Sequence, residues 1–300
     1  MDIFLTGGTG FVGSAIVEVA LRHGHSVRAL ARSEAAAGSL REAGATPVLG
    51  SLHDTELLAT EAATADGVIH TASPGDQTSA AIDEKVIDAV LGALRGSDKP
   101  YLHTSGVWIY GSTDGEIDED APLAPPPITE WRLPLDARVR AAAADGVRGI
   151  VIGPGIVYGY GKGLPNLLVN APRTAEEFPA LTFPGTGDQH WTTIHVDDLA
   201  RLYVAALTDG KAGAYYFGVS GVNPLVRDLA QAASHGIGLE GRVAPEGEAA
   251  TRDRLGPLAD AFLLDQQATG GRARADLGWE PKGRTLVDEL SIGFYSDPDA

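Results

Sequence analysis

A glycine-rich segment near the N-terminus is the feature that most restricts how this chain can fold. Residues 6–13 read Thr-Gly-Gly-Thr-Gly-Phe-Val-Gly, directly after a short apolar run at 3–5 and at the start of an apolar helical pattern. A strand, a glycine turn and a helix in this order are typical of a nucleotide-binding βαβ unit, where the glycines permit a sharp turn close to a pyrophosphate. The helix N-terminus also favours phosphate, because its N–H groups are unpaired and carry partial positive charge. The segment therefore predicts a dinucleotide site rather than a merely structural turn. The residues expected to contact the cofactor here are Gly7, Thr9, Gly10, Phe11, Val12 and Gly13.

The rest of the first half alternates strand-like and helix-like stretches. Short apolar runs are separated by roughly 10–15 residues with apolar positions at helical spacing. The strand-like runs lie at 3–5, 26–31, 47–50, 67–70, 101–104 and 149–152. Right-handed βαβ units in succession build a parallel sheet with helices on both faces. We therefore predict an α/β fold, a doubly wound parallel sheet of the Rossmann type with a smaller C-terminal substrate-binding lobe.

The second half is less regular. An apolar helical pattern at 200–207 follows Asp197 and Asp198, so we expect an aspartate to cap this helix and the helix to return to the first domain. The predicted nucleotide-binding domain comprises residues 1–158 and 189–212. The predicted substrate-binding lobe comprises residues 159–188 and 213–300.

Charge and cysteine content exclude several classes of partner. Lys and Arg number 23 against 40 Asp and Glu, and the formal net charge of −17 repels nucleic acid and anionic membranes. The absence of cysteine excludes disulfides and thiolate metal sites. No apolar run approaches the roughly 18 residues that cross a bilayer, and a first strand at Asp2 leaves no room for a secretory signal. We predict a soluble cytoplasmic monomer or homodimer whose partner is a small-molecule substrate.

The remaining titratable clusters have ordinary explanations. Glu116, Asp118, Glu119 and Asp120 form an acidic run that we interpret as a solvated loop, and no cluster with metal-ligand spacing is found elsewhere. His195 is expected to be structural, with its ring bound to neighbouring backbone.

The end of the second predicted strand indicates the type of cofactor. An NAD-specific site normally places an acid there for the ribose 2′-hydroxyl. This chain has Ala31 followed by Arg32, and a guanidinium can bind a 2′-phosphate as a fork. We therefore predict NADP in preference to NAD. The alternative is that Arg32 is only a solvated charge in a loop.

Several further motifs resemble those of the extended short-chain dehydrogenase/reductases, the family of NAD(P)-dependent epimerases, dehydratases and reductases. They include Val-Ile-His-Thr-Ala-Ser at 68–73, Leu-His-Thr-Ser-Gly at 102–106, Gly-Pro-Gly-Ile-Val-Tyr-Gly at 153–159, Ile-His-Val-Asp-Asp-Leu-Ala at 194–200 and Asp-Leu-Gly-Trp-Glu-Pro at 276–281. The resemblance covers nearly the whole chain. It implies further cofactor contacts from Leu52, Thr71, Ala72, Ser73, Pro154, Gly155 and Ile156.

The catalytic residues of that family are only partly present. The family uses a Ser or Thr that binds the substrate oxygen, a Tyr that passes a proton and a Lys four residues later on one helix. Ser105 matches the first of these, but no tyrosine lies between Tyr110 and Tyr158 and no lysine between Lys99 and Lys162. The chain thus resembles an atypical member without the Tyr-x-x-x-Lys pair.

Other residues occupy the positions of the missing pair. Alignment of the following helix places Arg132 near the Tyr position and Asp136 near the Lys position, a spacing at which the two could pair with each other. Tyr158 and Lys162 fit the pattern by letters, but glycines between them disfavour the helix that would align them. We predict Ser105 and Arg132 as the catalytic residues, with Ser105 polarising the substrate oxygen and Arg132 stabilising its developing charge.

Aromatic residues and one histidine fall in segments that line the substrate cleft of the family. They could form an apolar or stacking pocket, or pack in the core between the lobes. The predicted substrate-binding residues are Trp108, Tyr110, Trp131, Tyr158 and His190. Histidine is the residue type suited to acid–base work near neutral pH, so His190 could replace the missing acid, although a surface loop histidine is the ordinary alternative.

The leading hypothesis is an NADP(H)-binding oxidoreductase acting on a small organic carbonyl. A non-redox cyclase, dehydratase or isomerase using the same cleft and a non-catalytic NADP-binding sensor are the alternatives.

Overall fold

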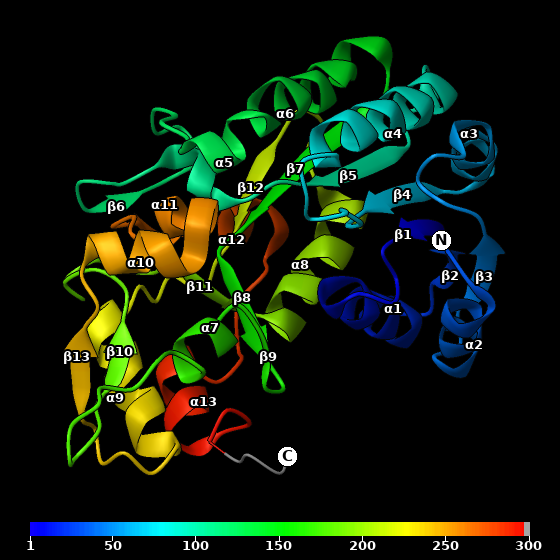
Figure 1. Cartoon of the computed structure of the whole chain (residues 1–300). Coiled ribbons are helices and arrows are strands. Elements are labelled where there is room, and N and C mark those ends of the chain that lie inside the picture. The colour runs from blue at the N-terminus through cyan, green and yellow to red at the C-terminus, as the bar shows by residue number, and fades with distance from the viewer. Residues whose placement is uncertain (297–300) are drawn as a thin grey trace.

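The computed structural model describes residues 1–296 and has a seven-stranded parallel sheet at its centre (Figure 1). The strand order is β12-β7-β5-β4-β1-β2-β3, and every neighbouring pair is parallel. The strands are β1 (Asp2–Thr6), β2 (Ser26–Ala31), β3 (Thr46–Leu49), β4 (Gly67–His70), β5 (Pro100–Thr104), β7 (Arg148–Pro154) and β12 (Tyr215–Gly218). The order reverses between β1 and β4, the point where open α/β sheets bind ligands at the carboxyl ends of their strands. The predicted doubly wound fold is confirmed.

Helices cover both faces of this sheet (Figure 1). Side chains alternate along β1, so Ile3 and Leu5 pack into one buried cluster while Phe4 packs into the other. The first cluster includes α1 (Phe11–Arg22), α2 (Glu34–Glu42) and α8 (Val196–Asp209). The second includes α3 (Thr55–Thr64), α4 (Ser79–Leu94) and α6 (Arg132–Ala141).

A third buried cluster lies in a smaller C-terminal lobe. Its elements are α7 (Asn166–Val169), β10 (Leu181–Phe183), α9 (Val226–Gly236), β13 (Val243–Pro245), α10 (Glu248–Leu255), η3 (Gly256–Leu258), α11 (Ala259–Phe262) and α13 (Leu286–Ile292). A small sheet of β8 (Ile156–Gly159), β9 (Lys162–Gly163) and β11 (Thr193–His195) continues from the end of β7. The remaining elements are η1 (Val107–Tyr110), β6 (Glu116–Ile117), α5 (Pro127–Glu130), η2 (Ala142–Asp145), β14 (Gln267–Ala268) and α12 (Gly271–Leu277).

Strand β12 lies in the segment 213–300 of the predicted lobe, and it pairs with β7 in the main sheet. The domain boundaries stay a prediction. The predicted cap of α8 needs correction. Helix α8 packs on α1 as expected, but its cap is His195, whose side chain accepts a hydrogen bond from the Asp197 N–H at 3.2 Å. The structural role predicted for His195 is thereby confirmed.

The acidic run is not wholly solvated. Glu119 is buried, its Oε1 accepts a hydrogen bond from the Phe217 N–H at 2.9 Å, and its Oε2 lies 3.7 Å from Nε of Arg272. The prediction of a solvated loop is wrong for Glu119, which ties β12 to the segment after β6. Residues 116, 118 and 120 are exposed, and the described residues contain no group of three or more His, Asp or Glu suited to a metal ion.

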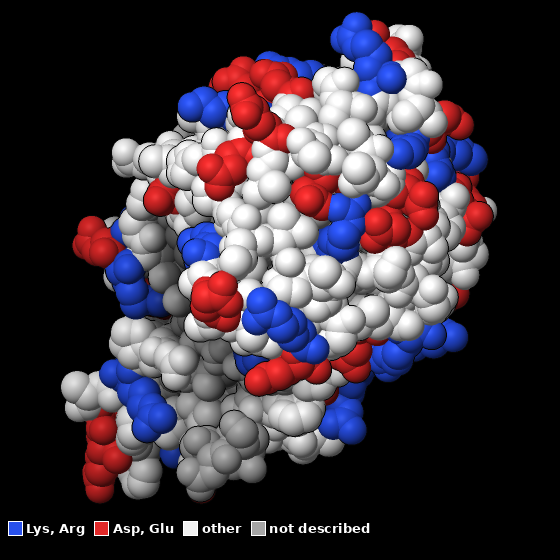
Figure 2. Space-filling model, turned by 90° about the vertical axis from the view of Figure 1, so that its right-hand side faces the viewer, with Lys and Arg blue, Asp and Glu red and all other residues white. Residues whose placement is uncertain are grey.

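Figure 2 shows the side of the molecule that lies on the right in Figure 1, where α2 and α3 are found. Acidic and basic side chains are interspersed over this face, without a continuous basic patch among the described residues drawn there. Throughout residues 1–296, each helix is too short or too polar to span a membrane.

Candidate functional site

The glycine turn after β1 can be built only with glycine at two of its positions. Gly7 has a φ of +85°, and a Cβ added there would lie 2.7 Å from Oγ1 of Thr71 and 2.8 Å from the Ala72 nitrogen. A Cβ at Gly13 would lie 2.0 Å from the carbonyl oxygen of Gly7. The turn is closed by a hydrogen bond from the Gly10 N–H to the same carbonyl at 2.8 Å. The backbone of the turn is therefore held tightly against both α1 and the end of β4.

The start of α1 fits a phosphate group. Gly10 is the cap residue and provides no side-chain hydrogen bond, and the first turn holds no acidic residue. The N–H groups of this turn are thus left without a side-chain acceptor or a competing negative charge. Thr9 and Gly10 are exposed and Phe11 and Val12 are half-buried, so this end of the helix is open. A dinucleotide pyrophosphate suits this arrangement.

The other predicted cofactor residues also lie at the carboxyl edge of the sheet. Arg32 is exposed and directly follows β2, while Ser33 next to it caps α2 by accepting a hydrogen bond from the Ala36 N–H. Thr71 follows β4 and donates its hydroxyl to the Thr6 carbonyl at 2.9 Å. Leu52 follows β3, and Ala72 and Ser73 follow β4. Pro154 ends β7 and is followed by Gly155 and the buried Ile156.

Ser105 directly follows β5 and is bound to a buried carboxylate. Its hydroxyl donates to Oδ2 of Asp136 on α6 at 2.5 Å, and its backbone N–H donates to Ile152 on β7 at 2.8 Å. Asp136 is 5% exposed, and α6 turns it toward the sheet together with Leu135 and Val139. Burial raises the pKa of Asp136 to about 7, although the Ser105 hydrogen bond and Arg132 oppose this rise.

A buried histidine faces the same carboxylate. Nε2 of His103 lies 3.8 Å from Oδ1 of Asp136, and each atom lacks a hydrogen-bond partner among the described residues. Burial, with His70 and Arg132 nearby, holds the pKa of His103 well below its usual value, so this ring is neutral. Our sequence interpretation did not identify Asp136 or His103 as site residues. One signal was available, since His103 interrupts the apolar pattern of β5.

Arg132 does not pair with Asp136. Its Nη1 donates to the Thr104 carbonyl at 3.2 Å, and its guanidinium lies over the Trp131 ring, 4.3 Å from the ring centroid. The pairing considered from their spacing is therefore wrong, because Asp136 faces Ser105. The guanidinium is half-buried beside the end of β5 and forms no ion pair with Asp136.

The predicted substrate-binding residues differ in their burial and in their contacts. Tyr110 is buried and donates its hydroxyl to the Glu119 carbonyl at 3.1 Å, so it packs in the core. Trp108 and Trp131 are half-buried, and Trp108 packs against Phe262 of the smaller lobe. His190 is half-buried, and its Nδ1 lies 2.8 Å from Oδ1 of Asp265.

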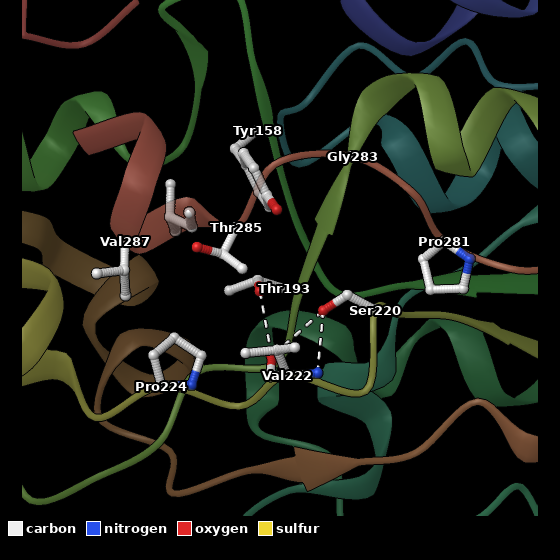
Figure 3. Close-up of a pocket in the computed structure, with 10 residues that line it drawn as sticks. Tyr158, Thr193, Ser220, Val222, Pro224, Pro281, Gly283, Thr285 and Val287 are labelled. Atoms are coloured by element: carbon white, nitrogen blue, oxygen red, sulfur yellow. Dashed lines mark hydrogen bonds between the residues drawn. The ribbon is translucent and has the colours of Figure 1, made fainter. Parts of the chain in front are cut away.

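Tyr158 lines a cavity that lies apart from Ser105. It is buried and donates its hydroxyl to the Arg284 carbonyl at 2.7 Å. Figure 3 shows it above Thr193, Ser220 and Val222, with the segment that carries Pro281, Gly283 and Thr285 passing behind. The cavity volume of about 90 Å³ is small beside the roughly 300–1,000 Å³ of usual ligand pockets. Tyr158 and the exposed Lys162 lie on the β8–β9 hairpin, so the prediction that no helix aligns them is confirmed.

The chain is similar to several known proteins. A family model described as the NAD dependent epimerase/dehydratase family matches residues 3–217. The chain is 32% identical over 301 residues to the uncharacterized protein C2A9.02 of Schizosaccharomyces pombe, covering 98% of this chain and 100% of that protein. It is 28% identical over 230 residues to a 4-hydroxy-2-methyl-3-oxo-4-farnesyl-3,4-dihydroquinoline-1-oxide ketoreductase of Stigmatella aurantiaca, covering 72% and 67% of the two chains.

A solved structure shares the fold. UDP-glucuronic acid 4-epimerase from Bacillus cereus, in complex with UDP-glucuronic acid and NAD, has a TM-score of 0.78 to this chain at 18% identity, covering 99% of each. At that identity the likeness concerns the fold.

Proposed function

This chain belongs to the NAD dependent epimerase/dehydratase family, and from that premise we propose that it is an NADP(H)-dependent oxidoreductase acting on a small organic carbonyl-type substrate. One observation carries the proposal. The glycine cradle after β1 and Ser105 after β5 lie at the same edge of the sheet, because both strands are parallel and only β4 separates them. Two strand spacings amount to roughly 10 Å, which one dinucleotide can bridge.

Each part of the site has a distinct task. Residues 7–13 hold the pyrophosphate, and Arg32 binds the ribose 2′-phosphate as a charge-assisted fork. A bound NADPH would supply a hydride to the substrate carbon. Ser105 binds the substrate oxygen, and the positive charge of Arg132 favours negative charge developing there. The similarity to a ketoreductase supports a carbonyl substrate.

Replacing Arg32 with alanine tests the cofactor assignment. We expect the NADPH affinity to fall at least about tenfold, equivalent to roughly 1.4 kcal/mol, because the 2′-phosphate loses its cation. The NADH affinity should stay the same, since NADH has no 2′-phosphate. Calorimetric titration with both cofactors measures the two effects.

Arg41→Ala is the matched control. Arg41 is an exposed arginine of the neighbouring helix α2, and its Nη2 lies 3.8 Å from Oε2 of Glu34. It should change neither affinity. Equal NADPH and NADH affinities of the unaltered protein, or an Arg32→Ala variant that binds NADPH normally, would contradict the NADP assignment.

A further inference from the structure

The carboxyl group of Asp136 is buried behind Ser105 and forms no ion pair with an arginine or lysine of the described residues. Its Oδ2 accepts the Ser105 hydroxyl, while its Oδ1 has no hydrogen-bond partner in the described structure. Of the two arginines on α6 near it, Arg132 donates to the Thr104 carbonyl and Arg140 donates to the Gly213 carbonyl. A buried polar atom without a partner is costly, and such atoms concentrate at functional sites.

Titratable and charged groups face Asp136 from every element packed around it. They are Tyr101 and His103 of β5, Asp83 of α4, Tyr110 of η1, Tyr215 of β12, and Arg132 and Arg140 of α6. Burial raises the pKa values of Tyr101 and Tyr215 well above 10, so both stay protonated. His103 stays neutral because burial lowers its pKa. Because burial raises the pKa of Asp136 to about 7, both of its protonation states are accessible near neutrality.

We propose that Asp136 is a positioning residue that stores the proton for the substrate oxygen and exchanges it through the Ser105 hydroxyl. The inference rests on the proposed function. It assigns to an Asp–Ser pair the proton transfer for which this chain lacks a tyrosine and lysine on α6.

The proton and electron balance is complete in the direction of carbonyl reduction. The dihydronicotinamide is the reductant and gives two electrons with its hydride to the carbonyl carbon. When Asp136 is protonated, its carboxyl O–H donates to Oγ of Ser105 across the same 2.5 Å separation, and the serine hydroxyl is free to point at the substrate. Ser105 then gives its hydroxyl proton to the substrate oxygen and takes the carboxyl proton of Asp136. Asp136 is left as a carboxylate and regains a proton from water. Alcohol oxidation runs the same transfers in reverse.

The first test follows turnover against pH. In carbonyl reduction only protonated Asp136 can donate, so kcat should fall about tenfold for each pH unit above 7. Asp136→Asn should lower kcat about 10²-fold at pH 6, flatten the profile and leave the NADPH affinity unchanged. Asp136→Glu should restore part of the pH dependence. Asp88→Asn is the control, because Asp88 is an exposed α4 carboxylate paired with Arg138. This variant should change neither kcat nor its dependence on pH.

The second test needs neither cofactor nor substrate. Infrared difference spectra of the ligand-free protein should contain a protonated carboxyl band that titrates with a midpoint near pH 7 and is missing in Asp136→Asn. In Ser105→Ala the midpoint should rise, since the Ser105 hydrogen bond lowers the pKa of Asp136. This variant also tests the inference should Asp136→Asn fail to fold.

The outcomes separate the inference from the proposed function. Two results would overturn the role of Asp136 alone. One is an Asp136→Asn variant that binds NADPH and turns over substrate with an unchanged pH profile. The other is an unaltered protein whose infrared spectrum has no carboxyl band that titrates near pH 7. Failure of the unaltered protein to bind NADPH overturns the proposed function, and this inference with it.

Discussion

Replacing Gly13 with alanine should lower the NADPH affinity at least about a hundredfold, or roughly 2.7 kcal/mol. The added Cβ would lie 2.0 Å from the Gly7 carbonyl oxygen, a backbone atom that cannot move without opening the turn. The Gly10 N–H bonds to that same carbonyl, so the displacement would spread to the start of α1. Calorimetric titration with NADPH measures the loss, and a thermal melt shows whether the variant is folded.

Gly92→Ala is the matched control for this change. Gly92 also lies in a helix, α4, but a Cβ added there has no atom within 4 Å. Alanine at such a position stabilises a helix by up to about 1 kcal/mol, so this variant should melt no lower and bind NADPH normally. A folded Gly13→Ala protein with normal NADPH affinity would mean that the dinucleotide does not use the glycine turn.

Replacing Ser105 with alanine should lower turnover about 10²- to 10³-fold. Removal of one positioned donor to a developing oxyanion costs about 2.7–4 kcal/mol in comparable sites. Here the change also breaks the hydrogen bond through which Asp136 is connected to the substrate oxygen. NADPH consumption with a panel of ketones and aldehydes measures turnover, and the NADPH affinity should remain within about twofold of normal.

The control for this substitution is Ser39→Ala on α2. That hydroxyl is exposed and donates to the Ala35 carbonyl of its own helix, so its loss should leave turnover unaltered. Normal turnover in Ser105→Ala would contradict a role at the substrate oxygen. It would favour the non-redox enzyme or the NADP-binding sensor that uses the same cleft.

The parts of the fold that were predicted correctly depend on local signals. Gly7, Gly10 and Gly13 lie within seven residues of one another, and the strands from β1 to β5 are separated by single helices. The pairing of β12 with β7 was not predicted, because the two strands lie more than 60 residues apart in the chain. No pattern near residue 215 indicates that pairing.

The candidate site was harder to predict because its chemistry depends on burial. Aspartate and glutamate are seldom fully buried, so an acidic run or a helix carboxylate is ordinarily interpreted as solvated. Glu119 and Asp136 depart from that rule through partners on β12 and after β5, far away in the sequence. The aromatic residues were difficult because they were predicted to bind substrate, whereas Tyr110 packs in the core. The sequence does not show that the Tyr110 hydroxyl already donates to a backbone carbonyl.

A crystal structure of the protein with NADP⁺ bound tests the central claim most directly. The account predicts the pyrophosphate at residues 7–13, the 2′-phosphate on Arg32, and nicotinamide C4 facing Ser105 and Arg132. A dinucleotide bound in this way would place hydride transfer beside the Ser105–Asp136 pair. A nicotinamide ring directed away from Ser105, or a dinucleotide bound elsewhere on the molecule, would contradict the account.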